Sequence, residues 1–179
     1  MAEVLLINCR TQGFVTKVEH LGLGYLAAVL SAHNIPAEVC DASFHGLPRQ
    51  NVVSHILATQ PRVVGFTVYY NNIIETLATS AALRRRGFDG HICLGGHHAS
   101  FHAADILTDR PEIDAVILSE AEGALVDLAH QVLQGSSWQA IPNVACRTDA
   151  ALVSNPCRPL VADLDTIPFP QRAGYETFL

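Results

Sequence analysis

Hydrophobic residues along this chain form short runs that alternate with longer stretches in which apolar positions recur at helical spacing. The short runs have the length and the β-branched content of buried strands. They cover residues 3–8, 37–42, 62–69, 91–96 and 114–119. The helical pattern lies between and after these runs. It predicts helices over residues 21–34, 47–59, 72–87, 100–108 and 120–135.

Strands that alternate with helices in this way predict an α/β fold with a parallel sheet covered on both faces. Right-handed crossovers then give a doubly wound domain. Five strands favour the flavodoxin-like order 2-1-3-4-5, in which ligands bind beyond the carboxyl ends of the strands. In this sequence those ends are residues 8–10, 41–43, 67–71, 95–98 and 119–122.

The pattern changes after Gly135. Residues 143–154 read as two short strands around a turn, which predicts a small β-hairpin. Residues 155–172 carry four prolines and no periodicity, so they predict an extended linker. We therefore expect a Rossmann-like domain over residues 1–137, with the hairpin and the proline-rich linker over residues 138–179.

Composition excludes several classes of protein. The net charge of −6 argues against a nucleic-acid partner, because such proteins need a basic surface. No apolar run approaches the roughly 18 residues of a membrane span, so no membrane partner is expected. The first run follows no basic segment and reads as a strand, not a signal peptide, which predicts a cytoplasmic protein. The five cysteines are scattered without metal-ligand spacing and read as buried thiols.

Three nucleotide and phosphate motifs are incomplete here. Residues 22–27 match a GxGxxA pattern, but they lie too far after the first strand for a dinucleotide fingerprint and read as a closely packed helix start. Residues 11–16 follow that strand and could form a phosphate loop of the FMN type or a plain loop. A phosphoacceptor receiver site needs acids where Asn8 and Thr67 stand, so that class is excluded.

The segment HICLGGHHAS places four unusual residues at the expected binding edge. His97 and His98 are adjacent in what reads as an extended turn, so they are poorly placed to bind one metal ion. Gly95 and Gly96 either form a tight turn or leave space for a ligand to lie against the backbone. The acids of residues 120–122 either cap a helix start or face a ligand there.

Six segments in order resemble the N-terminal cobalamin-binding domain of B12-dependent radical SAM enzymes. They are LGLGYLAAVL, VVGFTVYYNN, ICLGGHHAS, IDAVILSEAEGALVDLA, IPNVACR and RPLVADLDTIPFPQR. The resemblance covers nearly the whole chain, with two departures. The family's GEGE motif reads SEAE at residues 119–122, and the CxxxCxxC motif is absent. SAM and a [4Fe–4S] cluster are therefore expected only in a radical SAM barrel domain beyond these residues.

This resemblance implies a cobalamin-binding domain of a radical SAM enzyme, most often a methyltransferase, that holds cobalamin as a methyl carrier. Its partners would be cobalamin and the barrel domain of the same protein. Two alternatives stay open: a standalone cobalamin carrier without catalysis, and an FMN-binding flavodoxin-like protein. Neither a catalytic nor a metal-ligating residue is predicted in this chain. The predicted cofactor-binding residues are Gln12, Gly13, Asp41, Thr67, Val68, Tyr69, Asn71, Gly95, Gly96, His97, His98, Ser119, Glu120, Ala121 and Glu122.

The lower face of cobalt is expected to lack a histidine ligand. Many B12 proteins supply that ligand from a D-x-H-x-x-G motif after the first strand. His20 has no aspartate two residues earlier and has Leu23 where the motif needs glycine. His91 follows Asp89, but Leu94 takes the glycine position and the segment begins a strand at the opposite edge. The resemblance therefore implies base-off cobalamin with no histidine on the metal.

Overall fold

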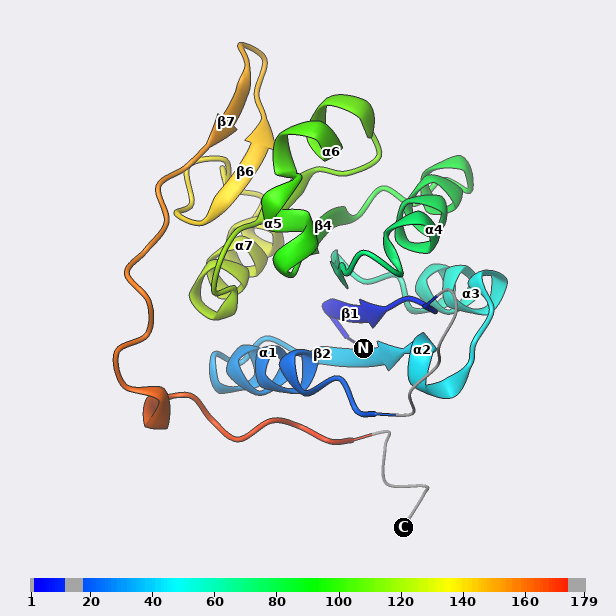
Figure 1. Ribbon diagram of the computed structural model, residues 1–179, viewed down its shortest axis with the longest axis horizontal. Coiled ribbons are helices and arrows are strands. Elements are labelled where there is room, and N and C mark those ends of the chain that lie inside the picture. The colour runs from blue at the N-terminus through cyan, green and yellow to red at the C-terminus, as the bar shows by residue number, and fades with distance from the viewer. Residues whose placement is uncertain (1, 12–17, 174–179) are drawn as a thin grey trace.

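The computed structural model describes residues 2–11 and 18–173, so Gln12 and Gly13, two of the predicted cofactor-binding residues, lie outside the described residues. The described chain forms one seven-stranded sheet with the order β2-β1-β3-β4-β5-β6-β7 (Figure 1). The first five strands are parallel, which confirms the predicted α/β fold and the order 2-1-3-4-5. They are β1 (Val4–Asn8), β2 (Ala37–Asp41), β3 (Val63–Thr67), β4 (His91–Gly95) and β5 (Ala115–Ile117).

Helices cover both faces of the sheet (Figure 1). One face packs against α1 (Leu21–Ala32) and α7 (Glu122–Gln134). The other face packs against α3 (Arg49–Thr59), α4 (Ile73–Arg85) and α6 (Ala103–Asp109). The short helices α2 (Ala42–His45) and α5 (His97–Phe101) follow the carboxyl ends of β2 and β4. This double cover explains why β1 and β3 are buried at every position and apolar at nearly every one.

Strand register determines which side chains face the α1 and α7 layer. Leu6 of β1 stands beside Gly65 of β3, and Gly65 stands beside Cys93 of β4. Leu6 and Cys93 belong to the core cluster that packs under α1 and α7. Gly65 therefore leaves a side-chain position empty on this face of the sheet.

The segment after β4 differs from the prediction. The extended turn expected at His97 and His98 is wrong, because α5 begins at His97 directly after Gly96. The single helix expected over residues 100–108 is two short helices, α5 and α6, with His102 at their junction. Gly96 has φ of +92°, which lets the chain turn from strand to helix without an intervening loop.

The predicted hairpin is confirmed and extends the same sheet. β6 (Val144–Arg147) pairs antiparallel with β5, and β7 (Leu152–Ser154) pairs antiparallel with β6. Residues 155–172, called the strap below, then run past α7 to α1 (Figure 1) and include the 3-10 turn η1 (Leu164–Thr166). The expected domain division at residue 137 stays a prediction. None of the helices in the described ranges is long and apolar enough to cross a membrane.

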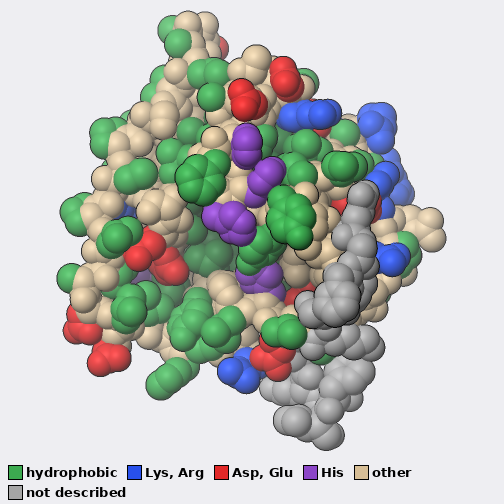
Figure 2. All heavy atoms as spheres, in the orientation of Figure 1, with side chains coloured by type: hydrophobic (Ala, Val, Ile, Leu, Met, Phe, Trp, Pro, Cys, Tyr) green, Lys and Arg blue, Asp and Glu red, His purple; other side chains and the backbone are tan. Residues whose placement is uncertain are grey.

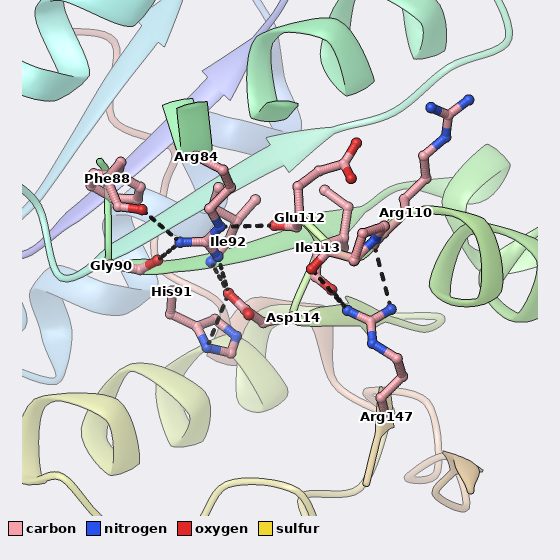
Figure 3. Close-up of polar contacts among 11 residues, drawn as sticks. Arg84, Phe88, Gly90, His91, Ile92, Arg110, Glu112, Ile113, Asp114 and Arg147 are labelled. Carbon is pink, nitrogen blue, oxygen red and sulfur yellow. Dashed lines mark hydrogen bonds and ion pairs between the residues drawn. The ribbon is translucent and has the colours of Figure 1, made fainter. Parts of the chain in front are cut away.

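Two arginines tie the loops together at the amino edge of the sheet, opposite the predicted binding edge (Figure 3). Arg84 donates to the carbonyl oxygens of Phe88 and Gly90, at 3.0 and 2.7 Å, and its Nη2 lies 2.6 Å from Asp114 Oδ2. Arg147 donates to carbonyl oxygens of the segment before β5. These bonds satisfy carbonyl groups of the loops before β4 and β5 and hold these loops at the amino edge of the sheet.

Candidate functional site

A cavity of about 280 Å³ lies between the sheet and the α1 and α7 layer and opens at the carboxyl edge of the strands. We call it the slot. Its floor comes from Leu6, Gly65 and Cys93, and its walls include Leu23 of α1 and Leu125 of α7. Burial raises the pKa of Cys93 to about 12, so its thiol stays protonated and contributes an apolar surface. The slot therefore suits a flat, largely apolar group.

A second hollow of about 450 Å³, the basin, adjoins the slot above the ends of β1 and β3. His20, Gly22, Tyr69 and His97 line both cavities, so the two hollows share a boundary. In Figure 2 histidine side chains gather at the centre of this face, beside a hollow with acidic side chains on its rim. Together the slot and the basin offer a deep apolar recess with a wider polar mouth.

His20 stands at this boundary with both ring nitrogens engaged. Its Nδ1 accepts a hydrogen bond of 3.2 Å from the backbone nitrogen of Leu23, which caps the start of α1. Nδ1 therefore carries no proton, and the neutral ring places its proton on Nε2. Nε2 lies 2.9 Å from the Tyr69 hydroxyl and 3.3 Å from the Thr67 hydroxyl. Burial lowers the pKa of His20, which favours this neutral form.

The twin glycines have different roles. A Cβ at Gly95 would meet no atom within 4 Å, and Gly95 lines the slot. A Cβ at Gly96 would stand 2.9 Å from the Val68 carbonyl oxygen, so Gly96 serves the packing of β3 against β4. Val68 is fully buried and its backbone nitrogen donates to the Gly95 carbonyl oxygen at 2.8 Å. Of the pair, Gly95 is the residue that leaves room for a ligand.

Two oxygens near the mouth have no hydrogen-bond partner among the residues that the structure describes. Asn71 Oδ1 is a buried atom in a residue that lines the basin, and Glu122 Oε2 is a buried atom in a residue that lines the slot. Buried acceptors without partners are costly in a folded protein. Both atoms can accept from N–H or O–H groups of a ligand, so these acceptors fit a ligand with amide or hydroxyl groups around an apolar body.

Glu120 and Asp41 bond to the protein itself. The Glu120 Oε2 atom accepts a hydrogen bond of 2.7 Å from the backbone nitrogen of Val161 in the strap. Asp41 Oδ1 accepts from Asn8 Nδ2 at 2.9 Å and from the backbone nitrogen of Phe44 at 3.0 Å, where it caps α2. The buried Asn72 extends the Asn8 contact by donating to Asn8 Oδ1 at 3.3 Å. These two carboxylates therefore stabilise the carboxyl edge by accepting hydrogen bonds from backbone amides of the strap and of α2.

The predicted residues thus fall into distinct groups. Those that line the slot are Thr67, Tyr69, Gly95, Gly96, His97, Ser119, Glu120, Ala121 and Glu122. Asn71 lines the basin. Asp41, Val68 and His98 lie outside the lining of both cavities. Gln12 and Gly13 lie outside the described residues. Ligand contact by any of these residues stays a prediction.

Sequence reasoning missed the slot's depth. The sequence pattern predicts ordinary core positions for the floor residues Leu6, Gly65 and Cys93. It concerns His20 only as a possible cobalt ligand. One signal was available: a single glycine inside the apolar strand VVGFT marks a close approach of backbone or ligand. Nothing in the sequence shows that Leu23 and Leu125 face each other across a cavity, because their helices are distant in the chain.

Fold and cavity together define an α/β domain with an open cavity at the carboxyl edge of its parallel sheet, where folds of this class bind their ligands. Residues 11–129 match the family model described as the B12 binding domain. Because this match spans more than half of the chain, the chain belongs to the B12-binding domain family.

Two curated relatives are similar over most of the chain. An uncharacterized methyltransferase of Pyrococcus horikoshii is 23% identical over 174 residues, covering 94% of this chain and 38% of that protein. An anaerobic magnesium-protoporphyrin IX monomethyl ester cyclase of Rubrivivax gelatinosus is 28% identical over 150 residues, covering 81% of this chain and 27% of that protein. The chain therefore spans less than two-fifths of the length of these relatives.

Two solved structures share the fold. The radical SAM methyltransferase TsrM from Kitasatospora setae, with cobalamin and a [4Fe–4S] cluster bound, gives a TM-score of 0.75 at 19% identity, covering 95% of this chain and 31% of that one. The cobalamin-dependent radical SAM enzyme OxsB, with aqua-cobalamin and S-adenosylmethionine bound, gives 0.81 at 18% identity, covering 93% and 24%. The chain thus resembles the cobalamin-binding part of cobalamin-dependent radical SAM enzymes, as its motifs predict.

Proposed function

We propose that the chain holds cobalamin in the base-off form, with the nucleotide tail in the slot and the corrin ring over the carboxyl edge. The observation that carries this proposal is the slot itself, which opens beside Gly95 and is apolar down to Gly65 and Cys93. The benzimidazole of the tail is a flat aromatic group, and such a group gains free energy by leaving water for apolar walls. Family membership and the slot's shape support the same ligand.

The polar groups at the mouth fit the rest of cobalamin. The corrin ring carries amide side chains, and the tail carries a sugar hydroxyl; both are hydrogen-bond donors. The unpaired oxygens Asn71 Oδ1 and Glu122 Oε2 supply acceptors for such donors. A Cβ at Gly95 would meet nothing, so the backbone there is open to close approach. These residues, with Thr67 and Tyr69, are the ones we propose to contact the cofactor.

The arrangement of His20 supports binding without a histidine on cobalt. One ring nitrogen accepts from the Leu23 amide, and the other carries the proton that faces Tyr69. A metal ligand needs an unprotonated nitrogen with a free lone pair. Coordination of cobalt by His20 would require breaking the α1 cap. We therefore propose that His20 lines the boundary of the slot and the basin and does not coordinate cobalt.

In the whole protein we propose that this domain serves a B12-dependent radical SAM enzyme of the methyltransferase class, which is the activity in the name of the Pyrococcus relative. When bound, cobalamin supplies a cobalt centre able to carry a methyl group, while the protein supplies binding and orientation. SAM and the [4Fe–4S] cluster would belong to a barrel domain that partners this one. The proposed division is a cobalamin domain over residues 1–137, with the hairpin and strap over residues 138–179.

Reconstitution tests the proposal directly. The purified chain is mixed with hydroxocobalamin, or separately with FMN, desalted, and examined by visible absorption. We expect retained corrin absorbance close to one cobalamin per chain and no retained flavin. A chain that stays colourless in excess cobalamin, or that retains FMN in its place, contradicts the proposal. Loss of corrin binding when Gly95 is replaced by a larger residue would place the cofactor in the slot.

A further inference from the structure

The strap bonds to both helices that form the slot walls. It leaves β7 and first pairs with the start of β6, where the Asn155 backbone nitrogen donates to the Val144 carbonyl oxygen at 3.1 Å. The Asn155 side chain donates to the carbonyl oxygens of Gln139 and Ile141, just before β6, at 2.7 and 2.9 Å. The strap then passes the start of α7 and reaches α1, with Ile167 packed on the core cluster under these helices. A proline-rich segment was expected to be an extended linker, and here it is fixed along its length.

At the α7 end, two side chains hold the strap to the turn that lines the slot. Glu120 accepts from the Val161 amide at 2.7 Å. Asn143, which is 2% exposed, donates to the Leu118 carbonyl oxygen at 2.9 Å and accepts from the Arg158 amide at 2.7 Å. Arg158 also forms an ion pair with Asp127 of α7. The turn at residues 119–121 is therefore joined to the strap on both sides.

At the α1 end, the strap lies directly on the helix backbone. The Gln171 amide donates to the Gly24 carbonyl oxygen at 3.0 Å. A Cβ at Gly24 would stand 2.6 Å from the Gln171 carbonyl oxygen and 3.1 Å from Pro170 Cβ. Only glycine allows this approach, since any side chain would push the strap away. Gly24 therefore serves this contact, and its neighbours Leu23 and Gly22 line the slot.

We propose that the strap is a clamp that sets the separation of α1 and α7 and hence the width of the slot, with Glu120 as its positioning residue. This proposal rests on the proposed binding of cobalamin in the slot. It assigns Glu120 to the strap and leaves Glu122, whose Oε2 atom has no partner within residues 2–11 and 18–173, as the carboxylate that would contact the ligand. A loosened strap would weaken contacts with the nucleotide tail more than contacts with the corrin ring, because the ring lies outside the slot.

Three substitutions in the full chain test the clamp. Glu120→Ala removes the acceptor of the Val161 amide, whereas Glu120→Gln keeps an acceptor oxygen without the charge. Asp165→Ala, on the exposed strap face, is the matched control. Affinity is measured for cobalamin and for dicyanocobinamide, which has the corrin ring but no nucleotide tail. Hydrogen exchange at the Val161 amide reports the state of the strap.

We expect Glu120→Ala to weaken cobalamin binding by about tenfold, the effect expected from the loss of one part-buried hydrogen bond. Cobinamide affinity should change by less than about twofold, because the corrin ring lies outside the slot and the ligand has no nucleotide tail. Hydrogen exchange at the Val161 amide should become faster, because the amide loses its acceptor. Glu120→Gln should recover most of the lost cobalamin affinity, because it keeps an acceptor oxygen for the Val161 amide, and Asp165→Ala should bind cobalamin like the wild type. Gly24→Ala should reproduce the selective loss from the opposite end of the strap, because alanine is well tolerated in the helix itself.

Two results would overturn the clamp while leaving the proposed function intact. One is a folded Glu120→Ala variant that binds cobalamin as tightly as the wild type. The other is an equal loss in Glu120→Ala and Glu120→Gln, which would mean that the Glu120 charge meets the ligand. If the wild-type chain binds no corrinoid at all, the proposed function fails and the clamp falls with it.

Discussion

The Cβ that Gly96 lacks would stand 2.9 Å from the carbonyl oxygen of Val68 and 3.2 Å from its backbone nitrogen. The residue also has φ of +92°, a conformation that L side chains rarely adopt. Its neighbour Gly95 has neither constraint and faces the slot. Gly96 is therefore required by the backbone fold, whereas Gly95 is free of that requirement and is the glycine we propose to leave room for the ligand.

The first prediction concerns Gly96. Gly96→Ala should lower the free energy of unfolding by about 2 kcal/mol or more, because it combines backbone strain with a steric clash. The measurement is urea unfolding followed by circular dichroism. Gly95→Ala is the control and should change stability by less than about 1 kcal/mol. Equal stability of the wild type and Gly96→Ala would show that the backbone relaxes at no cost.

The second prediction concerns Gly95. Gly95→Val should fold with nearly wild-type stability, since a Cβ at this position would meet no atom within 4 Å beyond its chain neighbours. Its side chain should extend into the slot and reduce cobalamin affinity by about tenfold or more through lost volume. Titration of cobalamin followed by visible absorption measures this. Undiminished affinity in the variant would mean that the tail does not pass Gly95.

A third prediction concerns the cap at His20. His20→Ala should destabilise the chain by about 1–2 kcal/mol, because the Leu23 amide loses its acceptor. His20→Asn should recover most of that loss, since asparagine is a strong N-cap residue. Thermal unfolding compares the three proteins. If asparagine gives no recovery, the contacts of His20 with Tyr69 and Thr67, and not the cap, account for its contribution.

The fourth prediction concerns the lower face of cobalt. Electron paramagnetic resonance of the reconstituted chain in the cob(II)alamin state should show no nitrogen superhyperfine splitting. The physical reason is that the His20 nitrogens are engaged within the protein and the benzimidazole would be held in the slot. Free cob(II)alamin at neutral pH, with its own base coordinated, provides the positive control. Nitrogen splitting in the protein sample would contradict base-off binding without histidine.

The fifth prediction concerns acid stability and His91. Burial lowers the pKa of His91 to about 4 from 6.5, with Asp114 opposing the shift and Arg84 adding to it. The unfolded state therefore takes up a proton at a higher pH than the folded state. The contribution of His91 to the free energy of unfolding is therefore fully present above about pH 6.5. It falls by about 3 kcal/mol as the pH is lowered to about 4.

The comparison that isolates this effect uses His91→Asn, which cannot titrate. Its free energy of unfolding should fall less steeply than that of the wild type between pH 6.5 and 4, as measured by urea unfolding at several pH values. His102→Asn, at an exposed histidine, should keep the wild-type slope. Parallel slopes for the wild type and His91→Asn would show that His91 titrates normally in the folded protein.

Periodicity alone was enough to place the strands and the main helices within a few residues of their observed bounds. Short elements were harder: the turn expected at His97 is a helix, because the conformation of Gly96 allows the chain to turn immediately. The twin glycines were correctly placed at the carboxyl edge, but sequence could not separate their roles. That separation depends on how β3 approaches β4, which is a contact between distant segments.

What the sequence determined by itself is the order of buried strands and amphipathic helices, and from that order the parallel sheet and its binding edge. Local patterns suffice for this because each strand or helix is encoded by its own residues. Only the tertiary structure decided that a slot lies between α1 and α7, that His20 is engaged on both nitrogens, and that Glu120 holds the strap. Apart from the local bond between His20 and Leu23, these features arise from contacts between residues far apart in the chain, whose geometry no local pattern records.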